Sequence, residues 1–135
     1  MIDIIFADHE ELFRTGATEV LADVNDVRIV AQPESPEQLL NALETFTPHV
    51  LVLSTSFLPA FSKIELALKR NQTALLVLAD DHDNTAYVRW LLARGVVYRS
   101  MDIPVLIDAL RQVARGELFV QSRSSDMRIG PSEVA

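Results

Sequence analysis

The stretch HVLVLSTSFLP, residues 49–59, contains the apolar run VLVL and then changes at Ser54 to small hydroxyl side chains. An apolar run without polar alternation is typical of a strand covered on both faces, as in a parallel sheet. The runs IDIIFA (2–7) and ALLVLA (74–79) have the same character. Together these segments predict the buried centre of a parallel sheet.

Two further strands are predicted at VRIVAQ (27–32) and VVYR (96–99), with helical patterns between all of them. The predicted helices cover residues 13–24, a segment capped by Ser35, then 61–71, 84–95 and 102–115. Strict alternation of strands and helices predicts an α/β fold with right-handed crossovers. We expect a five-stranded doubly wound parallel sheet of order 2-1-3-4-5 in a three-layer α/β/α arrangement.

The helical segments carry their own local signals. In the first, helical spacing predicts an inner face made of Phe13, Ala17, Val20, Leu21 and Val24. The second begins SPEQ (35–38), a capping box with proline at the first helical position. The last is predicted to bury Leu106, Ala109, Leu110 and Val113 and to stop at Gly116.

The composition limits the function classes. The chain has 135 residues, no cysteine and a formal net charge of −7, and its 12 Lys and Arg residues are scattered. We expect one domain without disulfides that does not bind nucleic acid, because neutralising phosphates takes clustered cations. The apolar run at the N-terminus is too short for a signal peptide or a membrane span, so we expect a cytoplasmic domain without membrane contact.

The folded domain is predicted to cover residues 1–120. ELFVQ (117–121) is expected to pack back on this domain. The segment that follows, SRSSDMRIGPSEVA (122–135), is rich in serine and contains Gly-Pro, which is typical of a linker or loose tail. We therefore predict a domain at 1–120 and a linker or tail at 121–135.

In sheets of this order, ligands bind outside the carboxyl ends of the strands, where the strand order reverses. The residues at or just after the ends of the first, third, fourth and fifth predicted strands are Asp8 with His9, Ser54, Ala79 and Arg99. These side chains are therefore predicted to share one site.

Four segments resemble receiver domains of bacterial response regulators of the NarL/LuxR class. They are ADHEELFRTG (7–16), TPHVLVLS (47–54), ARGVVYRS (93–100) and LIDALRQVARGELFV (106–120). The resemblance covers about residues 1–120 in register, with small offsets near Pro59. It implies the flavodoxin-like or CheY-like receiver fold and a role in two-component phosphorelay signalling.

The resemblance also implies how the site departs from its relatives. In that family two acids after the first strand and an Asp ending the third hold Mg²⁺, and the latter Asp is phosphorylated. A hydroxyl after the fourth strand and a Lys after the fifth contact the phosphoryl group. The matching positions here are Asp8, His9, Ser54, Ala79 and Arg99, and a switch aromatic is replaced by Val96. We therefore expect an atypical receiver that lacks the phosphoacceptor Asp and does not bind Mg²⁺ as a cofactor.

Of the acids that the family has in this pocket, only Asp8 is present, while Arg99 keeps the positive charge of the family's lysine. We predict an Arg99–Asp8 ion pair across the metal position, in which a fixed guanidinium replaces the cation. Such a pair would hold the domain in one conformation.

The expected function is regulation of transcription without Asp phosphorylation, through dimerisation or other protein contacts, and not catalysis. We expect a homodimer, because a receiver that cannot be phosphorylated can still dimerise. The resemblance implies a helix-turn-helix DNA-binding domain after residue 135, so we expect an excised domain, with a stand-alone receiver as the alternative. Candidate dimer surfaces combine the last helix (103–115) with the first or the fourth. Candidate aromatic residues at the interface are Tyr87, Trp90 and Tyr98.

Other interpretations were weighed. A ligand- or anion-gated receiver would use the donors of the degenerate pocket, and a conventional receiver could be phosphorylated on Asp80 or Asp81 instead. A Ser–His–Asp hydrolase using Ser54 and His9 is disfavoured, because no G-x-S-x-G elbow is present. The segment ADDHDN (79–84) lacks the ligand spacing of a metal site and is better explained as an acidic loop.

Overall fold

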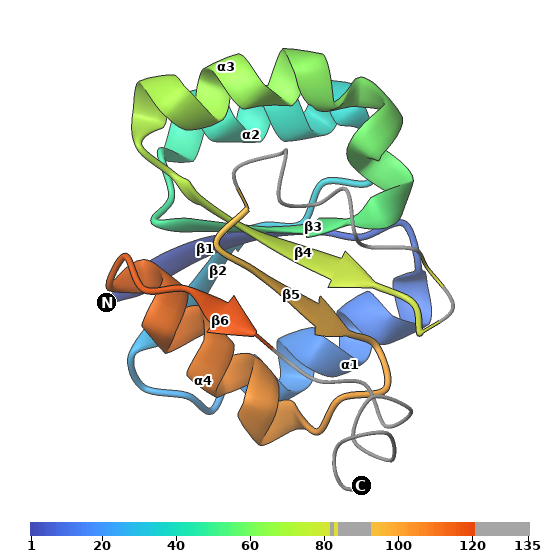
Figure 1. Ribbon diagram of the computed structural model, residues 1–135, viewed down its shortest axis with the longest axis vertical. Helices are drawn as coiled ribbons and strands as arrows, with labels where there is room; N and C mark the ends of the chain where they lie inside the picture. The colour runs from blue at the N-terminus through green and yellow to red at the C-terminus, as the bar shows by residue number, and fades with distance from the viewer. Residues whose placement is uncertain (82, 84–92, 121–135) are drawn as a thin grey trace, which may run out of the picture.

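The fold is a parallel sheet between two layers of helices (Figure 1), and the computed structural model describes residues 1–81, 83 and 93–120. The strands are β1 (Ile2–Ala7), β2 (Val27–Ala31), β3 (Val50–Ser54), β4 (Ala74–Ala79), β5 (Gly95–Tyr98) and β6 (Phe119–Val120). The helices are α1 (Glu11–Leu21), α2 (Pro36–Phe46), the 3₁₀ helix η1 (Thr55–Ala60), α3 (Phe61–Asn71) and α4 (Ile103–Ala114). The sheet order is β2-β1-β3-β4-β5-β6, with all pairs parallel.

This arrangement confirms the predicted fold class and the order 2-1-3-4-5. The bounds of β1, β3 and β4 are those predicted, whereas β2 ends one residue earlier and β5 both begins and ends one residue earlier. The short strand β6 adds a sixth member at the β5 edge and explains how the ELFVQ segment packs back. The predicted helix at 84–95 falls largely outside the described residues.

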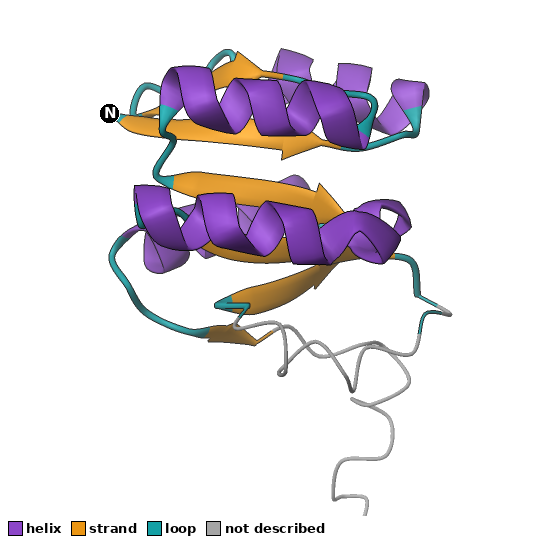
Figure 2. Ribbon diagram, turned by 90° about the horizontal axis from the view of Figure 1, so that it is seen from above, coloured by secondary structure: helices purple, strands orange, loops and turns teal. Residues whose placement is uncertain are grey.

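The core has two halves, one on each face of the sheet. Helices α2 and α3 cover one face, and α1 and α4 cover the other (Figures 1 and 2). Leu51 and Leu53 of β3 join the α2/α3 half, while Val50 and Val52 join the α1/α4 half. Because each side chain of this strand is fully buried, the uninterrupted apolar run follows from the three-layer architecture.

Helix α1 corrects one detail of the predicted inner face. The helix ends at Leu21, before Val24, and Val20 is 39% exposed. The buried residues are Ala17, Leu21 and, in place of an apolar side chain, Arg14. Phe13 and Val24 are partly buried against the same half of the core, so the predicted face is correct except at Val20.

Helix α2 begins with side-chain caps. The Ser35 Oγ accepts a hydrogen bond from the Gln38 amide at 3.2 Å. The Gln38 Oε1 in turn accepts one from the amide of Glu34 at 2.9 Å, one residue before the position that a capping box requires. The predicted start of the helix is thus confirmed, with a shifted reciprocal bond.

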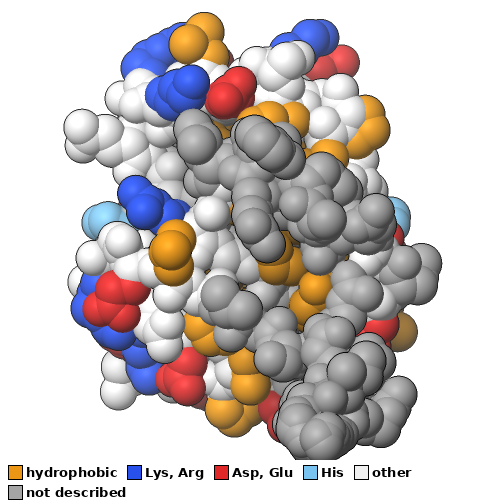
Figure 3. Space-filling view, viewed as in Figure 1, with side chains coloured by type: hydrophobic (Ala, Val, Ile, Leu, Met, Phe, Trp, Pro, Cys, Tyr) orange, Lys and Arg blue, Asp and Glu red, His pale blue; other side chains and the backbone are white. Residues whose placement is uncertain are grey.

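The outer surface carries charges of both signs. On the face in Figure 3, the coloured Lys and Arg side chains lie in small groups near Asp and Glu, without forming a continuous basic stripe. One ion pair joins distant segments: Arg111 of α4 donates from Nε and Nη2 to the two carboxylate oxygens of Asp26, both at 2.9 Å.

The helices of the described residues are all too short or too polar to span a membrane.

Replacing Ser35 with Ala should lower the free energy of unfolding by about 1 kcal/mol, because the Gln38 amide loses its acceptor. Urea unfolding measures this difference. The matched control is Ser62→Ala, at an exposed position inside α3, for which a change within about 0.5 kcal/mol is expected. Equal losses in the two variants would contradict the capping role.

The Arg111–Asp26 pair should make the stability of the domain more sensitive to acid. The hydrogen bond from Arg111 is the main cause that lowers the pKa of the Asp26 carboxyl. A lowered folded-state pKa means that the contribution is present above the ordinary carboxyl value of about 4 and is lost as the pH falls through the folded-state value. The Arg111→Gln variant should therefore lose less stability on acidification than the native chain, as measured by urea midpoints. Parallel pH profiles would show that the pair does not contribute.

Candidate functional site

The candidate site lies at the carboxyl ends of the central strands. Strand pairing aligns Ala7 with Leu53, Ser54 with Leu78, and Ala79 with Tyr98. Asp8 directly follows β1, and Arg99 directly follows β5. The register therefore brings the predicted strand-end residues to one edge of the sheet.

A bidentate ion pair joins Asp8 and Arg99. Arg99 Nη1 donates to Asp8 Oδ2 at 2.7 Å, and Arg99 Nη2 donates to Asp8 Oδ1 at 2.6 Å. The Asp8 side chain is fully buried and that of Arg99 is 12% exposed. The predicted ion pair is thus present, and it links two strands that are not neighbours in the sheet.

Three further groups surround the Arg99 guanidinium. Its Nε lies 2.8 Å from Asp80 Oδ1 and 3.9 Å from Glu10 Oε2, although the N–H makes no hydrogen bond with either. The guanidinium carbon lies 5.0 Å from the centre of the Phe13 ring, within cation–π range. Hydrogen bonding to Asp8 is the main cause that raises the pKa of Arg99, so its charge persists at every pH at which the protein would be studied.

Arg14, which the sequence analysis did not identify, holds the backbone beside Asp8. Its Nη1 donates to the Asp8 carbonyl oxygen at 2.6 Å, and its Nη2 lies 3.6 Å from Glu34 Oε2. The Glu10 amide completes the environment by donating to Asp8 Oδ1 at 3.2 Å. The spacing of Arg14 with Ala17 and Leu21 was the available signal, because it places an arginine on the inner face of α1.

Ser54 is fully buried at the end of β3 and is bonded to its surroundings. Its Oγ accepts a hydrogen bond from Arg99 Nη2 at 3.2 Å and lies 3.1 Å from Ser56 Oγ. His9 Nδ1 lies 3.5 Å from Ser54 Oγ and 3.6 Å from Asp8 Oδ1. The same imidazole nitrogen faces both groups, whereas a catalytic triad uses opposite nitrogens, so this geometry does not support a hydrolase.

The loop after β4 is hydrogen-bonded to the segments that follow β3 and β5. Asp83 Oδ2 accepts hydrogen bonds from Thr55 Oγ1 and from the Asp80 amide, both at 2.9 Å. Ser100 Oγ donates to Asp81 Oδ1 at 2.7 Å. Of the ADDHDN segment, His82 and Asn84 lie outside the described residues. Asp81 and Asp83 accept hydrogen bonds from neighbouring loops, while Asp80 faces Arg99.

The remaining predicted residues contribute less to this site. Ala79 is fully buried at the end of β4, and Val96 is half-buried against the α2/α3 half of the core. Tyr98 is 6% exposed in the structure, and its place at an interface stays a prediction. Tyr87 and Trp90 lie outside the described residues.

The residues of this site do not fit Mg²⁺. That ion requires an octahedron of oxygen ligands that includes carboxylates. Both oxygens of the only carboxylate at the ends of β1 and β3, that of Asp8, accept hydrogen bonds from a cation of the chain itself. The described part of the chain also contains no cluster of three His, Asp or Glu side chains arranged to hold a metal.

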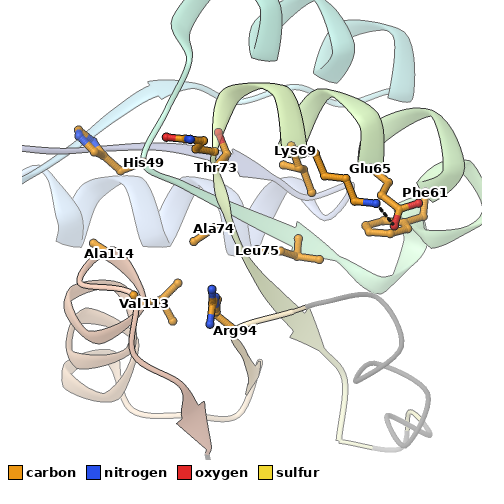
Figure 4. Close-up of a pocket in the computed structure, with 13 residues that line it drawn as sticks. His49, Phe61, Glu65, Lys69, Thr73, Ala74, Leu75, Arg94, Val113 and Ala114 are labelled. Atoms are coloured by element: carbon orange, nitrogen blue, oxygen red, sulfur yellow. Dashed lines mark ion pairs between the residues drawn. The ribbon is translucent and has the colours of Figure 1, made fainter.

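A separate cavity of about 390 Å³ lies at the opposite, amino-terminal ends of the strands (Figure 4). Its lining includes Thr73 and Ala74 at the start of β4, Arg94 before β5, and Val113 at the end of α4. It shares no residue with the site around Asp8.

Comparisons with known proteins agree with the geometry. No protein-family model matches the sequence. The chain is 27% identical over 128 residues to the transcriptional regulatory protein DegU of Brevibacillus brevis, covering 90% of this chain and 54% of DegU. It is 26% identical over 126 residues to the oxygen regulatory protein NreC of Staphylococcus aureus, covering 89% of this chain and 58% of NreC. The chain thus spans about half the length of these curated relatives.

Solved structures show the fold. The receiver domain of RcsB from Salmonella enterica in its apo form matches with a TM-score of 0.78 and 23% identity, covering 94% of this chain and 98% of that domain. The receiver domain of NarL from Mycobacterium tuberculosis matches with a TM-score of 0.71 and 20% identity, covering 86% and 98%. The described domain therefore has the receiver fold, and its sequence is similar to the matching parts of the regulatory proteins DegU and NreC.

Breaking the Arg99–Asp8 pair should destabilise the domain strongly. Arg99→Gln leaves a fully buried carboxylate without its cation and should lower the free energy of unfolding by about 3 kcal/mol. Denaturant unfolding measures this loss. The matched control is Arg28→Gln, which removes a bidentate pair with Asp3 in which the arginine is largely exposed, and its loss should be much smaller than that of Arg99→Gln.

A double-mutant cycle separates the pair from general packing. In the Asp8→Asn/Arg99→Gln variant the buried charge is gone together with its partner, so the loss should be smaller than the sum of the single losses by about 1 kcal/mol or more. Additive losses would show that the two side chains do not interact in solution.

Proposed function

We propose that residues 1–120 form an atypical receiver domain of a NarL/LuxR-type transcriptional regulator, and that this domain works without phosphorylation of a strand-end aspartate. The observation that carries the proposal is the Arg99–Asp8 pair, with both carboxylate oxygens engaged at 2.6 and 2.7 Å. In a phosphorylatable receiver, that carboxylate would be available to a divalent cation. Here a guanidinium attached to the chain has taken the place of the metal.

The chemistry of Ser54 supports the same interpretation. Acyl phosphate formation needs a carboxylate nucleophile and a cation that neutralises charge on the phosphoryl oxygens. The hydroxyl of Ser54 is buried and accepts a hydrogen bond from Arg99, so its lone pairs face a donor. Ala79 supplies no hydroxyl at the end of β4. No step of phosphoryl transfer is therefore assigned to this crevice, and no Mg²⁺ cofactor is proposed.

Side-chain hydrogen bonds connect the strand ends and loops around the crevice, which favours a single conformation of these loops. Asp8–Arg99 joins the ends of β1 and β5, Ser54–Arg99 joins β3 and β5, and Thr55–Asp83 joins the loops after β3 and β4. A domain held in this way would signal through assembly instead of through a phosphate-driven rearrangement. We propose a cytoplasmic homodimer, with α1 and α4 among its candidate surfaces, joined to a C-terminal helix-turn-helix domain in the complete protein.

The relatives support this regulatory role by their own descriptions. DegU is a transcriptional regulatory protein, and one RcsB structure contains two dimers of that protein bound to two parallel DNAs. An anion-gated receiver is less well supported, since three carboxylates already surround Arg99, those of Asp8, Asp80 and Glu10. An entering anion would meet net negative charge at that position.

Acetyl phosphate with Mg²⁺ should add no phosphoryl group to the native chain, as measured by intact mass under conditions that preserve acyl phosphates. The matched positive control restores the family residues with His9→Asp, Ser54→Asp, Ala79→Thr and Arg99→Lys, and this variant should gain the mass of one phosphoryl group. Phosphoryl addition to the native chain, on Asp80, Asp81 or elsewhere, would overturn the proposal.

Self-association should not depend on a phosphate analogue. In sedimentation equilibrium, the native chain should show a concentration-dependent dimer with the same dissociation constant in the presence and absence of beryllofluoride and Mg²⁺. A dimer that appears only with the analogue would reject the phosphorylation-independent mode, and a monomer at all concentrations would reject dimerisation by this domain.

A further inference from the structure

The chain makes a defined reversal after α4. Gly116 has a φ of +85°, its amide donates to the Val113 carbonyl at 3.0 Å, and the amide of Glu117 donates to the Gln112 carbonyl at 3.0 Å. These two bonds are those of a Schellman motif. Arg115 and Glu117 reinforce the turn through a surface ion pair at 2.9 Å. The segment leading to β6 is therefore set by local structure.

The strand β6 lies so close to Gly95 of β5 that only glycine fits at that position. Gly95 of β5 pairs with Phe119, and a Cβ added to Gly95 would lie 2.6 Å from the Phe119 carbonyl oxygen and 3.1 Å from the Phe119 Cβ. The Phe119 amide donates to the Arg94 carbonyl at 2.8 Å, and its ring packs against the α1/α4 half of the core. The edge of β5 is thus shaped for close approach of this strand.

The direction of β6 determines toward which end of the sheet the described chain runs after α4. Helix α4 ends at the amino-terminal ends of the strands, beside the cavity in Figure 4. Because β6 runs parallel to β5, it carries the chain back toward the end where Arg99 lies (Figure 1). Val120 pairs with Val96, three residues before Arg99, which corresponds to about 10 Å along the strand.

The pairing of β6 with β5 is short and lies beside exposed residues. The strand has only two residues, Leu118 before it is 67% exposed, and the turn at Gly116 borders the cavity of about 390 Å³. A segment with few buried contacts opens at a small fraction of the free energy of global unfolding. Release would leave the Schellman turn as the last fixed point of the domain.

We propose that β6 is a releasable exit strand. Paired with β5, it places Val120 beside Val96, on the way to the crevice end of the sheet. Released, it would leave Gly116, at the opposite end, as the last fixed residue of the domain. The two states give two placements of whatever follows, while the ion-paired crevice stays unchanged. The inference rests on the geometry of Gly95, Gly116 and Phe119, and it holds whether or not the crevice is phosphorylated.

Amide hydrogen exchange by NMR on the complete 135-residue chain tests the proposal. In the native chain, the Phe119 amide should be protected by about tenfold or more over an unstructured peptide, and should exchange faster than the Val97 amide inside β5. The Gly95→Ala variant should lose the Phe119 protection and keep that of Val97, since its methyl group would lie 2.6 Å from the Phe119 carbonyl oxygen and 3.2 Å from the Leu76 Cδ1, the far end of that side chain. The matched control is Gly16→Ala, where a Cβ meets nothing within 4 Å, and Phe119 protection should be unchanged.

A second variant covers the case in which Gly95→Ala fails to fold. Phe119→Pro removes the amide that bonds to Arg94 and leaves β5 intact. Trypsin cleavage after Arg115, followed by intact mass, should be about tenfold faster in either β6 variant than in the native chain or in Gly16→Ala. An unprotected Phe119 amide in the native chain, protection of Phe119 equal to that of Val97, or equal cleavage rates in all variants would overturn the exit-strand assignment.

Discussion

A fully buried carboxylate at the end of β1 is the constraint around which the crevice is organised. Asp8 cannot remain charged inside the domain without a compensating cation, and Arg99 reaches it from β5 with two short hydrogen bonds. The arginine in turn needs an environment of its own, which Asp80, Glu10 and the Phe13 ring provide. Arg14 donates to the backbone carbonyl of Asp8, so that α1, β1 and β5 are joined through a single residue, its carbonyl on one side and its carboxylate on the other.

Much of the fold could be predicted because its strongest signals are local. The uninterrupted apolar strands, the cap at Ser35 and the stop at Gly116 each depend on nearby residues, and the structure has them where the sequence indicated. The errors occur where tertiary packing overrides a local pattern. Val20 fits the helical pattern of apolar residues and is still exposed. Arg14 is buried because its guanidinium bonds to the Asp8 carbonyl.

The candidate site was predictable to the same degree and for the same reason. Parallel strands bring their carboxyl ends to one edge, so the meeting of Asp8, Ser54, Ala79 and Arg99 follows from the strand order alone. Opposite charges in that group then predicted the ion pair. The link from Thr55 to Asp83 could not be predicted, since it depends on the path of the loop after β4. Neither could β6, whose two residues are too few to give a periodic signal.

The identity of the cation has a consequence for the conditions to which the domain responds. A metal ion is drawn from solution, so the occupancy of its site follows the free concentration of that ion. The guanidinium of Arg99 is part of the chain, and its local concentration at Asp8 is set by covalent attachment alone. It cannot be diluted, chelated or exchanged for a competing ion. The positive charge beside Asp8 is consequently set by the amino-acid sequence and needs no ion from solution.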